Sequence, residues 1–196
     1  MIQMLHRYPI RVMYFRSIII GLIVALFIMP VNAFDRVQST VVVSGDPSVF
    51  YIDGVIDKDL WFNFYDRVKL GKIRTVELNS VGGYVIYAEE IAKLIRERRI
   101  TTKVRNGAIC LSACVLIFQS GIRRIAHKTA VFMIHSVKIE HDGFLVSDTW
   151  STNRFFGWLM RYGMTIEATR ALRTGRDMYF NSDSGIGYGV VTEIEK

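Results

Sequence analysis

The sequence predicts an α/β domain with a mostly parallel β-sheet, preceded by a short N-terminal segment. Short β-branched runs alternate with helical patterns from residue 49 onward, which is typical of layered α/β folds. The apolar fraction of 51% excludes a disordered chain, and 15 Gly and 3 Pro without a fixed period exclude collagen-like sequence. A chain of 196 residues fits one domain of ordinary size.

Residues 1–33 have the pattern of a secretory signal peptide. Three arginines and no acidic residue accompany the uncharged run Ser17–Met29, and Val31 and Ala33 stand at the two positions that a signal peptidase reads. The run is shorter than the ~20 residues of a full membrane span. We expect cleavage after Ala33, which leaves residues 34–196 as a secreted or periplasmic domain. The alternative is an uncleaved anchor that holds the domain at a membrane, facing outside the cytoplasm.

The first half of the domain is predicted to contain strand–helix units. The expected strands cover residues 40–43, 49–52, 73–78 and 101–104. The expected helices cover residues 60–70, 85–95 and 113–118. Asp57 or Asp59 should open the first helix, and two small-residue turns are expected at 79–83 and 106–108.

The second half is predicted to add two short strands at 123–126 and 130–134, followed by an excursion or hairpin at 137–146. Helices should follow at 148–161 and at 165–174, before a Gly-rich tail with short strand-like pieces. The first of these helices carries two Trp and two Phe, more aromatic surface than a peripheral helix easily buries. This surplus predicts contact between copies of the chain.

Ser112 is the first candidate nucleophile. It lies between a turn and an apolar helix, where a serine alone is usually a helix cap. Cys110 and Cys114 occupy the glycine positions of a Gly-x-Ser-x-Gly elbow, which disfavours an α/β-hydrolase. We expect both cysteines to be buried thiols that pack the helix against the sheet. A disulfide between them is the alternative in an oxidising compartment.

Two further motifs support Ser112 as a candidate nucleophile. The segment Asn79–Gly83 closes a strand with two glycines, so its backbone N–H groups could help to hold an oxyanion. His135 ends the apolar run that begins at Val131, which places it at the lip of the sheet. Taken alone, the glycines could be a tight turn and His135 a structural residue. No histidines, cysteines or carboxylates have metal-ligand spacing, so neither a metal site nor a cofactor is expected.

In combination, these motifs resemble the proteolytic subunit of the Clp protease, within the ClpP/crotonase-like superfamily. The matching segments are Asn79–Gly83, Ser112-Ala113, Met133–His135, Arg176–Phe180 and Tyr188–Val191. The resemblance runs in order through most of residues 34–196 and implies repeated β-β-α units with outer helices. With the N-terminal segment, the chain looks like the exported or periplasmic members.

The resemblance also implies catalytic roles. Ser112 would attack a scissile carbonyl, His135 would accept and return its proton, and Asp177 would orient the imidazole. The backbone N–H groups of Gly83 and Ala113 would form the oxyanion hole.

The sequence departs from the family pattern at three places. Val81 replaces a proline of the glycine motif. Asp183 is a second candidate for the orienting acid, less favoured than Asp177 because of its position relative to the motif. Residues 137–147 match poorly the family's handle, a segment that mediates ring stacking.

The predicted function is that of an exported serine endopeptidase that cleaves peptides or unfolded proteins, as a homo-oligomer without cofactors. The net charge of +7 includes no Lys/Arg block, so no nucleic-acid partner is expected, and membrane contact is expected only through an uncleaved N-terminal segment. One alternative is a catalytically silent ClpP-like binding or assembly module. A crotonase-type thioester enzyme is less favoured, because it gives no reason for Ser112 and His135 together.

Overall fold

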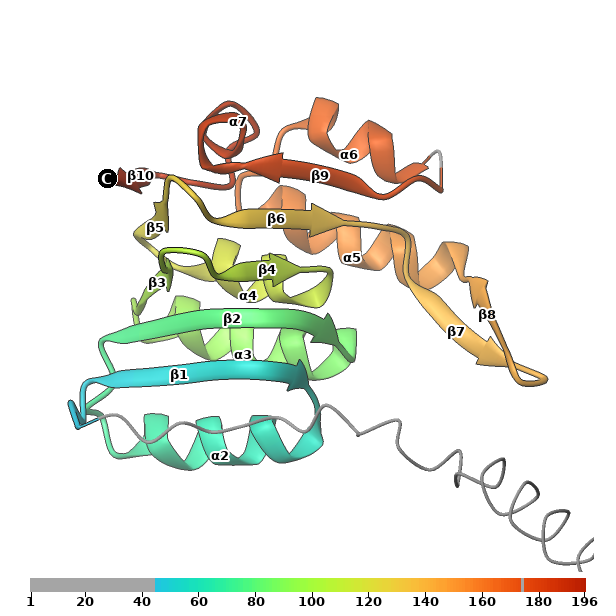
Figure 1. Ribbon diagram of the computed structural model, residues 1–196. Helices are drawn as coiled ribbons and strands as arrows, with labels where there is room; N and C mark the ends of the chain where they lie inside the picture. Colours follow the sequence, from blue (N-terminus) through green and yellow to red (C-terminus); the bar gives the residue numbers. More distant parts are fainter. Residues whose placement is uncertain (1–44, 174) are drawn as a thin grey trace, which may run out of the picture. The chain divides into compact units, whose positions relative to one another are not determined.

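The computed structural model describes residues 45–173 and 175–196 (Figure 1). The predicted signal segment and the strand expected at 40–43 lie outside these residues. The strands are β1 (Val49–Ile56), β2 (Thr75–Gly83), β3 (Thr101–Val104), β4 (Ile109–Leu111), β5 (Arg124–His127), β6 (Val131–Ile134), β7 (Lys138–His141), β8 (Phe144–Ser147), β9 (Met178–Asn181) and β10 (Glu193–Glu195). The helices are α2 (Lys58–Lys69), α3 (Val85–Glu97), α4 (Ala113–Ser120), α5 (Thr149–Arg161), α6 (Ile166–Arg173) and α7 (Ser182–Gly187).

Within the described ranges, eight strands form one sheet in the order β10-β5-β3-β2-β4-β6-β9, with β1 also paired to β2. The first half of β2 pairs with β3, and its last part pairs with β4. All neighbours in this sheet run parallel except β6 and β9, which are antiparallel. The predicted mostly parallel α/β architecture is therefore confirmed.

In the view of Figure 1, α3, α4 and α5 lie behind this sheet and α2 lies below β1. Asp57 caps α2 by accepting a hydrogen bond of 2.9 Å from the N–H of Leu60, so the first of the two predicted caps is the one used. Helix α4 differs from the others because all eight of its residues are buried. This agrees with the apolar sequence of its first six residues, and the helix anchors the residue that precedes it, Ser112, to the core.

One local prediction was wrong, and two short elements were not predicted. The glycine motif Asn79–Gly83 is not a turn but the end of β2, because Val55 and Ile56 of β1 pair with Gly82 and Gly83. Strand β4 was not predicted, since three residues show no period. The short helix α7 within the Gly-rich tail was also not predicted.

The expected excursion at 137–146 is the antiparallel hairpin β7–β8, whose eight strand residues are all exposed. It extends away from the sheet in Figure 1. Among the helices of the described residues, none has the length and apolar character needed to cross a membrane.

Candidate active site

The candidate residues meet at one edge of the sheet because of strand order. Strands β2, β4 and β6 end at this edge, and the antiparallel β9 begins there (Figure 1). The last paired residues are Leu111 with Met133 across β4–β6 and Ile134 with Met178 across β6–β9. Ser112, His135 and Asp177 each lie one residue beyond these pairs. Residues that are 23 and 42 positions apart in the sequence therefore lie on neighbouring strand ends.

Ser112 has an unusual backbone conformation, with φ 57° and ψ −124°, between β4 and α4. A non-glycine residue in such a sparsely populated region costs on the order of 1–3 kcal/mol and persists only when its surroundings impose it. Its N–H donates to the carbonyl of Met133 at 2.6 Å. Although Ser112 precedes α4, its side chain makes no capping hydrogen bond, so the simple cap interpretation does not describe it.

The two glycines of β2 allow the close approach that an oxyanion hole needs. A Cβ on Gly82 would lie 2.7 Å from the Cβ of Ser112 and 3.2 Å from the N atom of Ala113. A Cβ on Gly83 would overlap the backbone of Ile56. Both glycines also have positive φ, 97° and 150°. Ala113 is the first residue of α4, where the helix leaves N–H groups without intrahelical partners.

His135 is half-buried, and its Nδ1 lies 2.6 Å from the carbonyl oxygen of the next residue, Ser136. A carbonyl oxygen can only accept, so Nδ1 carries the proton in this contact. In the neutral ring, Nε2 then has a free lone pair, as a general base requires. Sequence reasoning did not identify Ser136, because it acts through its main-chain carbonyl and gives no side-chain signal.

Asp177 is exposed and lies opposite His135 by strand register. In the described part of the chain, no hydrogen bond joins Asp177 to His135, and none joins the Ser112 hydroxyl to His135. Asp183 lies in the first turn of α7, after Asn181, which pairs with Val131 at the opposite end of β6. The register therefore favours Asp177 over Asp183 as the neighbour of His135.

The expectation of two free thiols was wrong. Cys110 and Cys114 form a disulfide, with Cα atoms 5.2 Å apart, and both residues are fully buried. The bond joins β4 to the first turn of α4 and encloses Ser112. A spacing of four residues is compatible with either state, so the sequence alone could not decide between them.

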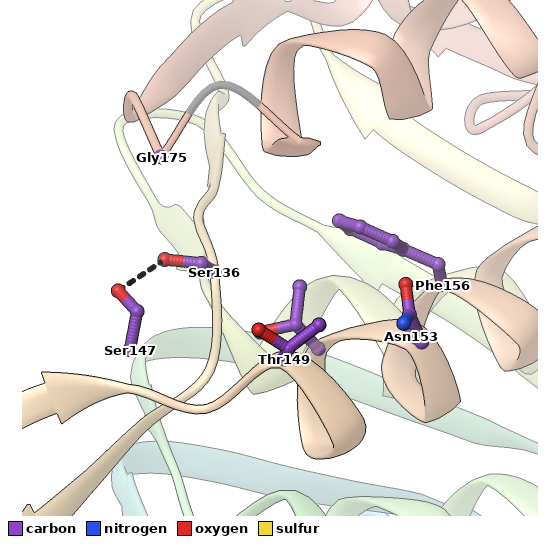
Figure 2. Close-up of a pocket in the computed structure, with 7 residues that line it drawn as sticks. Ser136, Ser147, Thr149, Asn153, Phe156 and Gly175 are labelled. Atoms are coloured by element: carbon purple, nitrogen blue, oxygen red, sulfur yellow. Dashed lines mark hydrogen bonds between the residues drawn. The ribbon is translucent and has the colours of Figure 1, made fainter.

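A cavity of about 230 Å³ lies beside Ser136, next to His135. Figure 2 shows the hydroxyls of Ser136 and Ser147 joined by a hydrogen bond at the base of the β7–β8 hairpin, 3.1 Å long. Asn153 and Phe156 of α5 and Gly175, two residues before Asp177, also line this space. This space is therefore lined by Ser136, the neighbour of His135, and by Gly175, while His135 and Asp177 are not among its lining residues.

A second hollow, of about 190 Å³, lies beside the start of α3, immediately after the glycine motif. Val85, Ile86, Val137 and Trp150 contribute apolar surface to it. The buried carboxylate of Glu89 and the guanidinium of Arg154 form an ion pair at its wall, with an Nε–Oε1 distance of 2.9 Å. This carboxylate and the hydrogen bonds from Arg154 hold the pKa of Arg154 above its usual value.

Within residues 45–173 and 175–196, no group of three His, Cys, Asp or Glu side chains is arranged to hold a metal ion. His127 is half-buried and its Nδ1 contacts the hydroxyl of Thr129 at 2.8 Å. His141 is exposed in β7.

Comparison with solved structures shows the fold. A ClpP1 variant from Listeria monocytogenes is 21% identical, with a TM-score of 0.53 over 77% of this chain and 92% of that one. The ClpP protease catalytic domain from Plasmodium falciparum is 19% identical, with a TM-score of 0.63 over 76% and 85%. A variant of the 1510-N membrane-bound stomatin-specific protease is 14% identical, with a TM-score of 0.60 over 74% and 77%.

The chain therefore has the ClpP-like fold that the sequence motifs predicted. A scan against protein-family models gives no match, and the sequence matches no curated protein.

Proposed function

We propose that the protein is an exported serine endopeptidase that hydrolyses peptide bonds in peptides or unfolded proteins. The observation that carries this proposal is the strand order β2-β4-β6-β9, since these four neighbours bear the glycine motif, Ser112, His135 and Asp177 at one edge. The fold of ClpP-like proteases supports it at the level of architecture.

In the proposed reaction, the hydroxyl oxygen of Ser112 attacks the scissile carbonyl while Nε2 of His135 takes its proton. The N–H groups of Gly83 and Ala113 donate to the oxyanion of the tetrahedral intermediate. His135 then gives the proton to the leaving amine, and an acyl-enzyme remains on Ser112. Water, deprotonated by His135, releases the acid and restores the serine. Asp177 stabilises the imidazolium that forms in both steps.

The hollow beside the glycine motif supports a peptide substrate. Its apolar walls include Val85, Ile86 and Val137. In the sequence, Val85 and Ile86 follow the proposed oxyanion donor Gly83, and Val137 follows the proposed base His135. Because Glu89 neutralises the charge of Arg154, the hollow suits an apolar substrate side chain rather than an acidic one.

One observation favours the alternative of a catalytically silent module: His135 is hydrogen-bonded to neither Ser112 nor Asp177 in the described residues. Catalytic hydrogen bonds are often long in proteins without substrate and tighten in the complex, so this geometry is compatible with both functions. Reactivity of the serine distinguishes them.

A fluorophosphonate probe makes this test, because it modifies serines whose hydroxyl is activated by a base. We expect labelling of the purified protein at Ser112, located by mass spectrometry of the peptides. Ser112→Ala should abolish the label. Ser120→Ala, which alters the last residue of α4, should leave the label in place. Absence of label on well-folded wild-type protein would leave the silent module as the function.

Export is part of the proposal, and two features support it. Residues 1–33 have the signal-peptide pattern, and the Cys110–Cys114 disulfide suits an oxidising compartment. We expect the chain expressed through a secretory pathway to begin at Phe34, as measured by intact mass. A full-length chain that resists extraction from membranes would instead indicate an anchor.

We also propose a homo-oligomer. The hairpin and α5 expose large apolar side chains, among them Phe144, Leu145 and Trp150, at 73%, 71% and 69% of their surface. Light scattering at micromolar concentration should give a mass above that of one chain, and Trp150→Glu should release smaller species. A monodisperse wild-type monomer would contradict this.

A further inference from the structure

We infer that the Cys110–Cys114 disulfide is the clamp that holds the backbone of Ser112 in its unusual conformation, so that the reactivity of the nucleophile depends on oxidation of this pair. The part of the inference that concerns reactivity rests on the proposed function. The part that concerns conformation does not.

The position of the bond relative to the serine is the first argument. Cys110 and Cys114 stand two residues before and two residues after Ser112, where a nucleophile elbow usually has glycines. Glycines allow a strand and a helix to approach closely around a sharp turn. Here the same two positions are bonded covalently, which limits the distance between β4 and α4 across that turn.

The need for such a constraint is the second argument. Among the described residues, three non-glycine residues have positive φ: Arg99, Ser112 and Asp142. Arg99 and Asp142 are exposed in turns that carry no chemistry. Ser112 is half-buried, so its conformation must be imposed by its surroundings.

The hydrogen bonds around Ser112 do not by themselves fix its backbone conformation. Its N–H donates to Met133, and its carbonyl accepts from the N–H of Val115 at 3.0 Å, which is a normal first turn of a helix. Its side chain gives no capping bond. The disulfide is therefore the covalent link across the turn, and its short loop affects this turn more than the unfolded chain.

The burial of both cysteines protects the disulfide from reduction by thiols in solution. Neither cysteine is exposed, so a thiol in solution reaches the bond only when β4 and α4 open locally. Reduction by dithiothreitol adds two electrons and two protons to give two thiols, while the two thiols of the reductant form one cyclic disulfide. The state of the pair is thus set mainly during folding, when the bond either forms or does not.

The test compares three proteins: the oxidised wild type, the wild type refolded in dithiothreitol, and Cys110→Ala/Cys114→Ala. Mass spectrometry after alkylation in denaturant verifies the thiol state. Val115→Ala is the matched control, since it removes buried volume from the same turn of α4 and keeps the disulfide. Two quantities are measured: the hydrogen-exchange rate of the Ser112 amide and the rate of fluorophosphonate labelling.

Without the disulfide, we expect the Ser112 amide to exchange at least tenfold faster, while the amides of β1 and β3 keep their protection. Labelling should fall at least tenfold and return after reoxidation of the refolded wild type. Val115→Ala should change labelling less than threefold.

Unchanged exchange at Ser112 in the folded, reduced protein would overturn the inference, as would a loss of protection throughout the domain. If the oxidised wild type is not labelled at all, the proposed function fails, and the exchange measurement still decides whether the disulfide is a clamp. If the double variant does not fold, the refolded wild type provides the comparison.

Discussion

Ser112 and His135 end neighbouring strands, yet their surroundings restrain them to different degrees. Ser112 is followed by a fully buried helix, enclosed by a disulfide and approached closely by Gly82. Among the described residues, the side chain of His135 has one hydrogen bond, to its neighbour Ser136, and Asp177 is exposed. Ser136 also lines a pocket. The proposed nucleophile therefore has a more constrained backbone than the proposed base and acid, which are half-buried and exposed.

This difference suggests how the site works. Preorganised donors contribute most to transition-state stabilisation, since they need no rearrangement during the reaction. Imidazole and carboxylate can be aligned later, when substrate or a neighbouring copy of the chain fills the space beside them. We call Ser112, Gly82, Gly83 and Ala113 the rigid half of the site, and it should therefore tolerate substitution poorly. We call His135, Asp177 and the base of the hairpin the loose half, and it should show graded effects. His135 is the exception, because it is the proposed base.

The largest effect is expected at His135. His135→Ala removes the group that accepts the serine proton, and loss of one member of such a unit removes most of its benefit. Peptidase turnover should fall by about a million-fold, and fluorophosphonate labelling should become undetectable. His127→Ala, a histidine that contacts Thr129, is the control and should label normally. Normal labelling of His135→Ala would remove the histidine from the mechanism.

Gly83→Ala tests the rigid half and should have the second largest effect. A Cβ would overlap the backbone of Ile56, so the backbone that carries the Gly83 N–H, a proposed oxyanion donor, must shift. Loss of one oxyanion donor typically lowers turnover by about 10²–10³-fold, and labelling should decrease comparably.

Gly107→Ala is the matched control for the backbone. Gly107 also has positive φ, 69°, but a Cβ there meets nothing within 4 Å. It should cost about 1–2 kcal/mol of stability, measured by denaturant unfolding, with normal labelling of the folded protein. Equal labelling of both variants would mean that Gly83 gives the site no specific geometry.

The sequence predicted the layered fold because runs of β-branched and aromatic residues mark strands such as β1 and β3, and its helices bury regular stripes, as Leu60, Phe64 and Val68 do in α2. It did not predict β4, which is three residues long. Local patterns also cannot show that the glycine motif continues a strand, since that conformation depends on pairing with β1.

For the site, motifs identified Ser112, His135 and Asp177, and strand register explains why they meet. The contact of Ser136 with His135 was beyond prediction, since every residue has a carbonyl and only the fold selects one. The disulfide was left open because four-residue spacing permits both states.

Asp177→Asn tests the loose half and should have a moderate effect. The Ser136 carbonyl keeps the proton on Nδ1 of His135, so the correct tautomer survives without the carboxylate. What is lost is a charge-assisted interaction worth about 1.5–3 kcal/mol, or roughly 10- to 100-fold in labelling rate. Asp183→Asn, at the far end of β6, should leave the rate unchanged. The reverse pattern would make Asp183 the acid.

The smallest effect concerns Asp148, which caps α5 at the base of the hairpin and accepts a hydrogen bond of 2.7 Å from the N–H of Ser151. The hydroxyl and the N–H of Ser151 hold the pKa of Asp148 below its usual value. A carboxyl with a lowered pKa in the folded state stabilises the fold above its unfolded pKa of about 3.9, and this contribution is lost as the pH falls through the folded pKa.

Asp148→Asn keeps a capping side chain but removes the titrating charge, so it isolates this contribution. Because Asp148 is only half-buried and solvent screens its charge, the thermal midpoint of the variant should lie only slightly below that of the wild type at pH 7. The difference should shrink as the pH falls below the unfolded pKa of about 3.9 and through the lowered pKa of the folded-state carboxyl. A difference that grows over this range would show that the charge of Asp148 does not stabilise the hairpin base, and that this part of the loose half is held by other contacts.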